Sequence, residues 1–219
     1  MMGKVIKKFC LLLVLFVGIG SSGVVAAEMS ALDARKLLAQ KYHIPVTSPD
    51  ASLQKLCEFE KGNNFDYAKA AELLFIMGAN PNLLFNSSSY GTTMATPLTR
   101  AALYADVDPK QVKYKLIKTM LDYGADPNGV IDVAGGRIQL SVINYAANYS
   151  TPEIFSLLLD YGADPRRKLA NTNLEYGPTL VLADMKYKLE ETKRDYPGSV
   201  AIKNLEKKIP IFQKRFPNL

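Results

Sequence analysis

Few side chains in this 219-residue chain could carry out chemistry. His43 is its only histidine, and its cysteines are Cys10 and Cys57. Any Cys-His or Ser-His-Asp arrangement would therefore have to use His43. His43 stands where a helix beginning near residue 30 would end, and Cys57 falls on a helical stripe with two leucines. We expect His43 to interact with the last carbonyls of that helix and Cys57 to be buried, with a Cys57–His43 hydrolase as the alternative.

Metal-binding and phosphate-binding patterns are missing from the sequence. A zinc site needs several Cys or His ligands at short spacing, and the segment "NNFD" at 63–66 supplies only part of a calcium loop. The segment "AGGRI" at 134–138 has two glycines but lacks the spacing and the lysine of a phosphate loop, so it predicts a hairpin tip. We expect no catalytic residue, no cofactor and no metal, and hence a protein that is not an enzyme.

The first 27 residues have the pattern of a secretory signal peptide. Lys4, Lys7 and Lys8 form a positive segment, Phe9 to Gly20 form an apolar one, and small residues lead to a cleavage site near Ala27. The alternative is a retained membrane anchor, because the uncharged stretch is long enough to span a bilayer. The sequence therefore predicts a periplasmic or secreted protein.

The charge of the remaining chain is nearly balanced. Of 27 basic and 21 acidic residues, three lysines leave with the signal, so 24 basic residues face 21 acidic ones. This balance argues against a nucleic-acid binder, and we expect no membrane contact after cleavage. Residues 28–219 have the length of a single domain, and their one cysteine excludes an intramolecular disulfide.

A repeat runs through that domain. Three apolar helical runs end in "MGANPN", "YGADPN" and "YGADPR", with glycines at 78, 124 and 162. Glycine at the end of a helix adopts a left-handed conformation without penalty, and the following proline prevents a return to helix. Spacings of 46 and 38 residues between these glycines indicate a repeat architecture.

Capping residues mark where helices should begin. An N-terminal helix should start near Ser30, and a final amphipathic helix should be interrupted at Pro210. The repeat helices should begin at Thr96 and Ser141, which each open a shorter helix, at Thr151, and at Asp108, which is followed by Pro109 and by Gln111 in the capping-box position.

The segment "TPLTRAALYADVDPKQVKYKLIKTMLDYGADPN" resembles an ankyrin repeat. Thr96-Pro97-Leu98 stands at the family's Thr-Pro-Leu-His tetrapeptide, with Thr99 in place of His, and Gly124 to Asn128 stands at its Gly-Ala-Asp-hydrophobic-Asn ending. The resemblance implies an all-α ankyrin-repeat solenoid of stacked helix-turn-helix pairs with protruding β-turn or hairpin loops, about three to four repeats with helical caps. Degenerate N-terminal helices would occupy 28–62, core repeats 63–167, and a degenerate repeat with a cap 168–219.

Ankyrin repeats bind other proteins, so the resemblance also implies a binding surface. It would comprise fingers at 83–95, 129–140 and 166–178 together with the exposed side of each first helix. Tyrosine and arginine are common anchors of protein interfaces, and small polar residues adapt around them. The alternative is that the tyrosines pack back onto their own helices. The candidate partner-binding residues are Tyr90, Arg100, Tyr104, Arg137, Asn144, Asn148, Tyr149 and Tyr176.

These observations predict a non-enzymatic protein-binding module of exported bacterial type. One role is an immunity protein that binds and inhibits a toxic effector. The alternatives are an accessory or protective partner of a periplasmic enzyme such as catalase, and a secreted ankyrin effector that targets host proteins. The expected partner is another protein and not a nucleic acid, and the oligomeric state is left open.

Overall fold

The computed structural model describes residues 29–58, 62, 64–87, 93–102, 105, 108, 110–133, 138–166 and 177–218. The signal peptide predicted for residues 1–27 lies outside this part of the chain. The described part is predominantly helical, which confirms the expected class at that level. Its helices are α1 (Ala31–Gln40), α2 (Pro49–Leu56), α3 (Tyr67–Ile76), α4 (Pro97–Ala102), α5 (Val112–Asp122), α6 (Val142–Tyr149), α7 (Pro152–Asp160), α8 (Pro178–Asp195) and α9 (Val200–Arg215).

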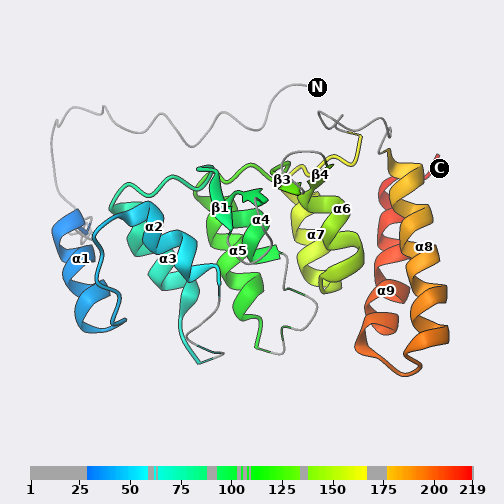
Figure 1. Cartoon of the computed structure of the whole chain (residues 1–219), viewed down its shortest axis with the longest axis horizontal. Helices are drawn as coiled ribbons and strands as arrows, with labels where there is room; N and C mark the ends of the chain where they lie inside the picture. The colour runs from blue at the N-terminus through cyan, green and yellow to red at the C-terminus, as the bar shows by residue number, and fades with distance from the viewer. Residues whose placement is uncertain are drawn as a thin grey trace, which may run out of the picture.

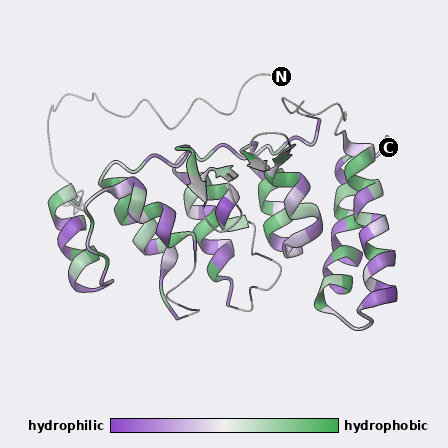
Figure 2. Ribbon diagram, in the orientation of Figure 1, coloured by the Kyte–Doolittle hydropathy of each residue, from purple (hydrophilic) through white to green (hydrophobic). Residues whose placement is uncertain are grey.

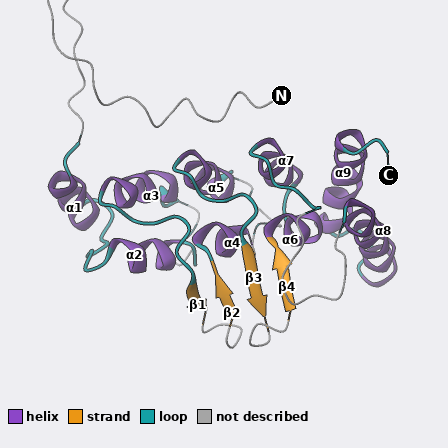
Figure 3. Ribbon diagram, turned by 90° about the horizontal axis from the view of Figure 1, so that it is seen from above, coloured by secondary structure: helices purple, strands orange, loops and turns teal. Residues whose placement is uncertain are grey.

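Consecutive helices pair, and the pairs stand side by side in one row (Figure 1). The pairs are α2 with α3, α4 with α5, α6 with α7, and α8 with α9. Seen from above, the row has two layers (Figure 3): an inner layer of α2, α4, α6 and α8, and an outer layer of α3, α5, α7 and α9. Each outer helix packs against the next, and α1 packs against α3 at the N-terminal end.

Four short strands project from the inner layer (Figure 3). They are β1 (Phe85–Ser87), β2 (Thr93–Ala95), β3 (Val130–Val133) and β4 (Ile138–Ser141), and they form one antiparallel sheet in the order β1-β2-β3-β4. The fingers predicted at 83–95 and 129–140 are thus hairpins, and they are joined edge to edge because β2 pairs with β3. The tips at 88–92 and 134–137 and most of the third finger lie outside the described residues.

The turns that close α3, α5 and α7 have the predicted chemistry. Gly78, Gly124 and Gly162 have φ of +90°, +88° and +93°, which lie in the region that only glycine adopts without strain. The side chains that follow accept hydrogen bonds from the backbone two residues on, as when Asp126 Oδ1 accepts from the Asn128 amide at 2.9 Å. Local sequence therefore determines each of these turns.

Two asparagines link successive turns into a ladder. Asn82 donates from Nδ2 to the Gly124 carbonyl at 2.9 Å and accepts at Oδ1 from the Asp126 amide at 2.7 Å. Asn128 makes the same pair of bonds to the third turn, at 3.2 Å to the Gly162 carbonyl and 2.7 Å from the Asp164 amide. We call these four bonds the asparagine ladder. It holds neighbouring helix pairs in register by hydrogen bonding as well as by packing.

Small and apolar side chains allow the layers to approach closely. The alanine pairs 101–102 and 146–147 on α4 and α6 are buried. Figure 2 shows the hydrophobic positions spread along every helix of the row, so each helix contributes a face to one continuous core. Burial of that apolar surface is the main force that holds the pairs together.

The predicted start of α5 was wrong. The helix begins at Val112, and Gln111 precedes it with a left-handed φ of +54° and no side-chain cap. Asp108 still serves the helix, because its carboxylate accepts from the amides of Lys113 at 3.1 Å and Tyr114 at 2.8 Å. The left-handed residue changes the direction of the chain so that the capping carboxylate reaches the first turn from farther upstream.

The predicted interruption at Pro210 was also wrong, because α9 runs through it. Proline removes one helical hydrogen bond and crowds the preceding turn. Here the helix is anchored on both sides of the proline, by Lys208 before it and Phe212 after it, both fully buried. The Phe212 ring lies 6.0 Å from the ring of Phe155 on α7. Tertiary contacts thus outweigh the local preference.

Lys208 is itself an unexpected core residue. Its ammonium donates to the carbonyls of Ala146 at 3.1 Å and Ser150 at 2.9 Å, where α6 ends. The carbonyls at the end of a helix carry partial negative charge, so a buried cation there is compensated, even though the Ala146 carbonyl also accepts from the Ser150 amide at 3.1 Å. Lys208 on α9 therefore caps the C-terminal end of α6.

Candidate protein-binding face

The inner helices are positioned by the caps that the sequence predicted. Thr96 accepts from the Thr99 amide at 3.3 Å to begin α4, and its hydroxyl also shares a 2.6 Å hydrogen bond with that of Thr99. Ser141 accepts from the Asn144 amide at 3.3 Å to begin α6. Because the hairpins lead directly into these caps, the sheet and the inner helices form one contiguous face (Figure 3). We call this face the hairpin face.

The structure places the four described candidate residues at different depths. Arg100 on α4 is 3% exposed and Asn144 on α6 is 8% exposed, so their side chains offer little surface to a partner. Asn148 is half-buried, and Tyr149 is 43% exposed. The other candidates, Tyr90, Tyr104, Arg137 and Tyr176, lie outside the described residues.

Tyr149 belongs to an aromatic and cationic group between α6 and α8. Its ring lies 4.7 Å from that of Tyr145, and the Lys188 ammonium lies 5.9 Å from its centre. Two further tyrosines, Tyr187 and Tyr196, are exposed on and just after α8. Sequence reasoning missed them, although the alternation of tyrosine with basic residues after position 184 could have indicated them.

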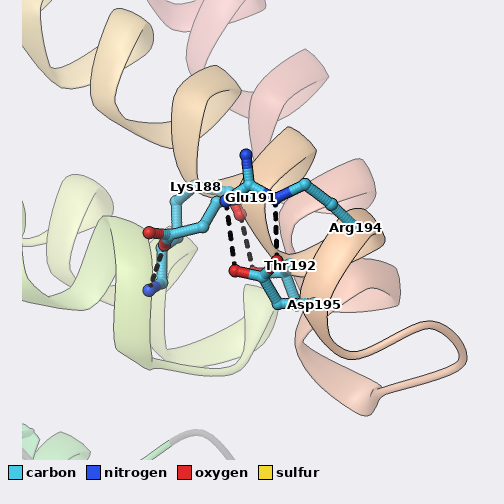
Figure 4. A network of polar contacts seen from close by, with 5 residues as sticks. All are labelled: Lys188, Glu191, Thr192, Arg194 and Asp195. Carbon is cyan, nitrogen blue, oxygen red and sulfur yellow. Dashed lines mark hydrogen bonds and ion pairs between the residues drawn. The ribbon is translucent and has the colours of Figure 1, made fainter.

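A polar network holds the charged groups of α8 in place (Figure 4). Lys188 donates to Glu191 at 2.7 Å, and this hydrogen bond raises the pKa of Lys188 above its usual value. Arg194 makes two contacts with Asp195, at 2.7 and 3.1 Å, and they lower the pKa of the Asp195 carboxyl. Exposed pairs of this kind contribute little to stability, but they fix the orientation of charges that a partner would meet.

A shallow apolar pocket lies at the base of the first hairpin. It has a volume of about 250 Å³ and lies between α2 and β1, with Phe85 and Leu83 on one side and Asp50 on the other. Asp50 accepts from the Asn80 amide at 2.7 Å, which joins α2 to the turn after α3. The adjacent Leu83 and Leu84 are both exposed large apolar side chains. Apolar side chains that are exposed together in one patch are a feature of surfaces that bind proteins.

The structure removes Cys57 as a candidate nucleophile. Its side chain is fully buried, as predicted, and burial raises the pKa of the Cys57 thiol well above its usual value. Only the thiolate attacks, so a thiol that stays protonated in the core cannot serve a substrate. The Cys57–His43 hydrolase is therefore wrong. The imidazole of His43 makes no hydrogen bond with the carbonyls that end α1 among the described residues, and it lines a cleft instead.

The described residues provide neither a metal centre nor a membrane-spanning helix. Within those residues, no group of three or more His, Cys, Asp or Glu side chains could hold a metal ion. None of the helices in the described ranges is long and apolar enough to cross a membrane.

Comparison with known proteins does not assign the chain to a family. No protein-family model matches it, and no curated protein matches it significantly.

Proposed function

We propose that this chain is an exported ankyrin-repeat protein that binds another protein through its hairpin face and catalyses no reaction. The observation that carries the proposal is the asparagine ladder between turns that each end a helix pair, the first two of which lead into a hairpin. Ankyrin repeats combine the same parts, namely two helices, a glycine turn and a projecting hairpin. Residues 28–219 would form one domain of this kind.

The proposed binding surface combines apolar and aromatic contacts. Leu83 and Leu84 at the first hairpin and Tyr149 on α6 are exposed on elements of the hairpin face. Tyrosine is over-represented among the residues that give most of the binding energy in protein interfaces, and the two leucines add apolar area around it. Repeat proteins commonly use such extended faces to bind partners. A protein partner therefore fits the surface better than a small molecule would.

Within this class we favour an immunity protein that occludes a toxic effector. The predicted signal peptide would carry it to the compartment where such an effector acts, and a compact chain without catalytic groups suits a dedicated inhibitor. An accessory partner of a periplasmic enzyme and a host-targeting effector use the same surface, so the identity of the partner decides between them.

The first test is capture of the partner. The chain from residue 28 is used as bait against an envelope extract of the source organism, and mass spectrometry identifies what stays bound. A secreted hydrolase or pore-forming protein supports immunity, whereas a resident periplasmic enzyme supports the accessory role. If the bait retains no protein from either the envelope extract or a host extract, the protein-binding proposal is overturned.

A matched pair of variants locates the surface. Tyr149→Ala removes a 43% exposed tyrosine from the hairpin face, and Tyr123→Ala removes an equally exposed one from the outer layer. Both lose one close ring contact, at 4.7 Å to Tyr145 and 4.8 Å to Phe75, and Tyr149→Ala also loses the 5.9 Å approach of Lys188, so its folding cost should be higher by at most about 1 kcal/mol. Capture should weaken for Tyr149→Ala and persist for Tyr123→Ala, and equal capture would place the surface elsewhere.

Cell fractionation tests the location. Protein in the periplasm, with a new N-terminus near residue 28, is the expected result. Protein in the medium would favour the host-targeting alternative, and full-length protein in the membrane would mean that the signal is retained as an anchor.

A further inference from the structure

A second concavity lies at the opposite end of α3 from the hairpins. It has a volume of about 250 Å³ and is enclosed by the loop after α1, by α2 and by the first residue of α3, Tyr67. The first hairpin, in contrast, begins after the C-terminal end of α3. This N-terminal cleft is therefore separate from the hairpin face, and its chemistry can be considered by itself.

Each polar side chain that lines the N-terminal cleft can donate a hydrogen bond. His43 and Lys55 lie at its wall, with the hydroxyl-bearing side chains of Ser52 and Tyr67. No acidic residue lines it among the described residues. Within the same described ranges, neither the Lys55 ammonium nor the His43 imidazole has a hydrogen-bond or ion-pair partner. The formal side-chain charge at the cleft among the described residues is thus that of the exposed Lys55, which is positive and has no acidic neighbour in the lining.

The helix ends around the cleft do not change that sign. Leu56 is the last residue of α2, whose C-terminal end is partly negative, and Tyr67 is the first of α3, whose N-terminal end is partly positive. These two partial charges oppose each other at the same cleft. The full charge of Lys55 therefore decides which ligand is attracted.

The rest of the wall is apolar. Ile44, Pro45 and Leu56 contribute aliphatic surface, and the ring of Tyr67, which is 1% exposed, adds a rigid side chain held by the core. Small-molecule sites have this composition, with a mostly apolar wall and a few polar groups that fix orientation. The volume is below the roughly 300–1,000 Å³ of sites for drug-sized ligands, so the occupant is smaller.

The backbone holds His43 at the cleft in an uncommon conformation. His43 has φ of +52°, a left-handed value that few residues other than glycine adopt. The Ile44 amide keeps it there by donating to the Leu38 carbonyl at 3.0 Å, and the side chains of Tyr42 and Val46 are buried on either side. Strained residues of this kind cluster at ligand sites.

We propose that the N-terminal cleft binds a carboxylate carried on a short apolar body. Lys55 and His43 face the carboxylate, and Ile44, Pro45 and Leu56 contact the apolar part. The same chemistry is available from a free small acid and from an acidic side chain or C-terminus of a protein. The inference depends only on the cleft and stands independently of the proposed protein-binding function.

The single histidine makes the test direct. The imidazole C–H resonances of His43 have no other histidine to overlap with, so the full chain is titrated with N-acetyl-leucine and, separately, with N-acetyl-leucinamide, which lacks the carboxylate. The acid should shift these resonances saturably and the amide should not. No saturable shift with the acid, or the same shift with the amide, would overturn the proposal.

Two variants assign the roles. Lys55→Gln should weaken N-acetyl-leucine binding about tenfold or more, because a charge-assisted hydrogen bond is lost, while Lys36→Gln, an exposed lysine of α1 outside the cleft, should not. His43→Gly removes the imidazole and also relaxes the left-handed backbone, so the protein stays folded. Calorimetry should show weaker binding to it. Unchanged binding by both cleft variants would overturn the site.

A capture experiment distinguishes the two sources of carboxylate. A protein retained by the Lys36→Gln chain and lost from the Lys55→Gln chain would supply the carboxylate itself. A protein retained equally by both, with N-acetyl-leucine binding intact in the unmodified chain, assigns the cleft to a free acid. If no protein is captured, the result contradicts the protein-binding function, whereas carboxylate binding at the cleft is still judged by the N-acetyl-leucine titration.

Discussion

Removing one of the two asparagines of the asparagine ladder should lower the stability of the whole row of helix pairs. Asn128→Ala deletes the side chain that donates to the Gly162 carbonyl at 3.2 Å and accepts from the Asp164 amide at 2.7 Å. A hydrogen bond contributes a net 0.5–1.5 kcal/mol or so to stability, so losing two should lower the free energy of unfolding by about 1–3 kcal/mol. For a chain of this size, that corresponds to a fall in Tm of about 2–12 °C.

The natural control is the third turn, where Arg166 occupies the ladder position. Its guanidinium lies 5.2 Å from the ring of Phe216 and makes no ladder contact to another turn among the described residues, so Arg166→Ala should cost about 0.5–1 kcal/mol, the value of an exposed cation–π contact. Urea denaturation of both variants and of Asn82→Ala measures the difference. Equal losses for Asn128→Ala and Arg166→Ala would refute the idea that the ladder connects the helix pairs.

Four further experiments test the need for glycine in a turn, the burial of two core residues and the ionisation of one carboxyl group. Gly124→Val places a β-branched residue at φ +88° and should cost more than about 1 kcal/mol by thermal melting; an unchanged Tm would mean that the turn does not need glycine. Cys57 should resist a thiol reagent until urea unfolds the protein, because burial raises the pKa of its thiol, and labelling of the native chain would contradict its burial. Lys208→Ala should lower the free energy of unfolding by more than about 2 kcal/mol in urea, because two carbonyls lose a buried charged donor; a smaller loss would show that water replaces it. Burial raises the pKa of the Asp184 carboxyl, so its charged form destabilises the fold above that pKa; Asp184→Asn should therefore raise Tm at pH 7 and leave it unchanged near pH 3, and the reverse order would exclude this cause.

Local chemistry made part of the fold predictable from the sequence. Each helix that begins at Thr96, Ser141 or Thr151 depends on one side chain that accepts from an amide three residues on. Each turn at Gly78, Gly124 or Gly162 depends on a φ that one residue type adopts freely. These features involve contacts within a few residues, and the residues that make them are adjacent in the sequence.

The candidate site was less predictable. Arg100 and Asn144 belong to residue types that are usually exposed, and the structure buries both because the neighbouring helix pairs enclose the inner helices. Tyr149 is exposed as the binding hypothesis required, and its neighbour Lys188 comes from a helix some forty residues further along the chain. Exposure depends on what packs against a residue, and a single sequence does not state that.

The sequence by itself determined the glycine turns, the helix starts at Ser30, Thr96, Ser141 and Thr151 and the repeat spacing, since these follow from backbone conformations and caps within one turn. Only the tertiary structure decided that the hairpins join into one sheet, that α9 continues through Pro210 and that Lys208 closes α6 from another helix pair. It also decided that His43 lines a cleft with Lys55. Each of these outcomes depends on contacts between distant segments, whose combined energy exceeds the local preference of any one residue.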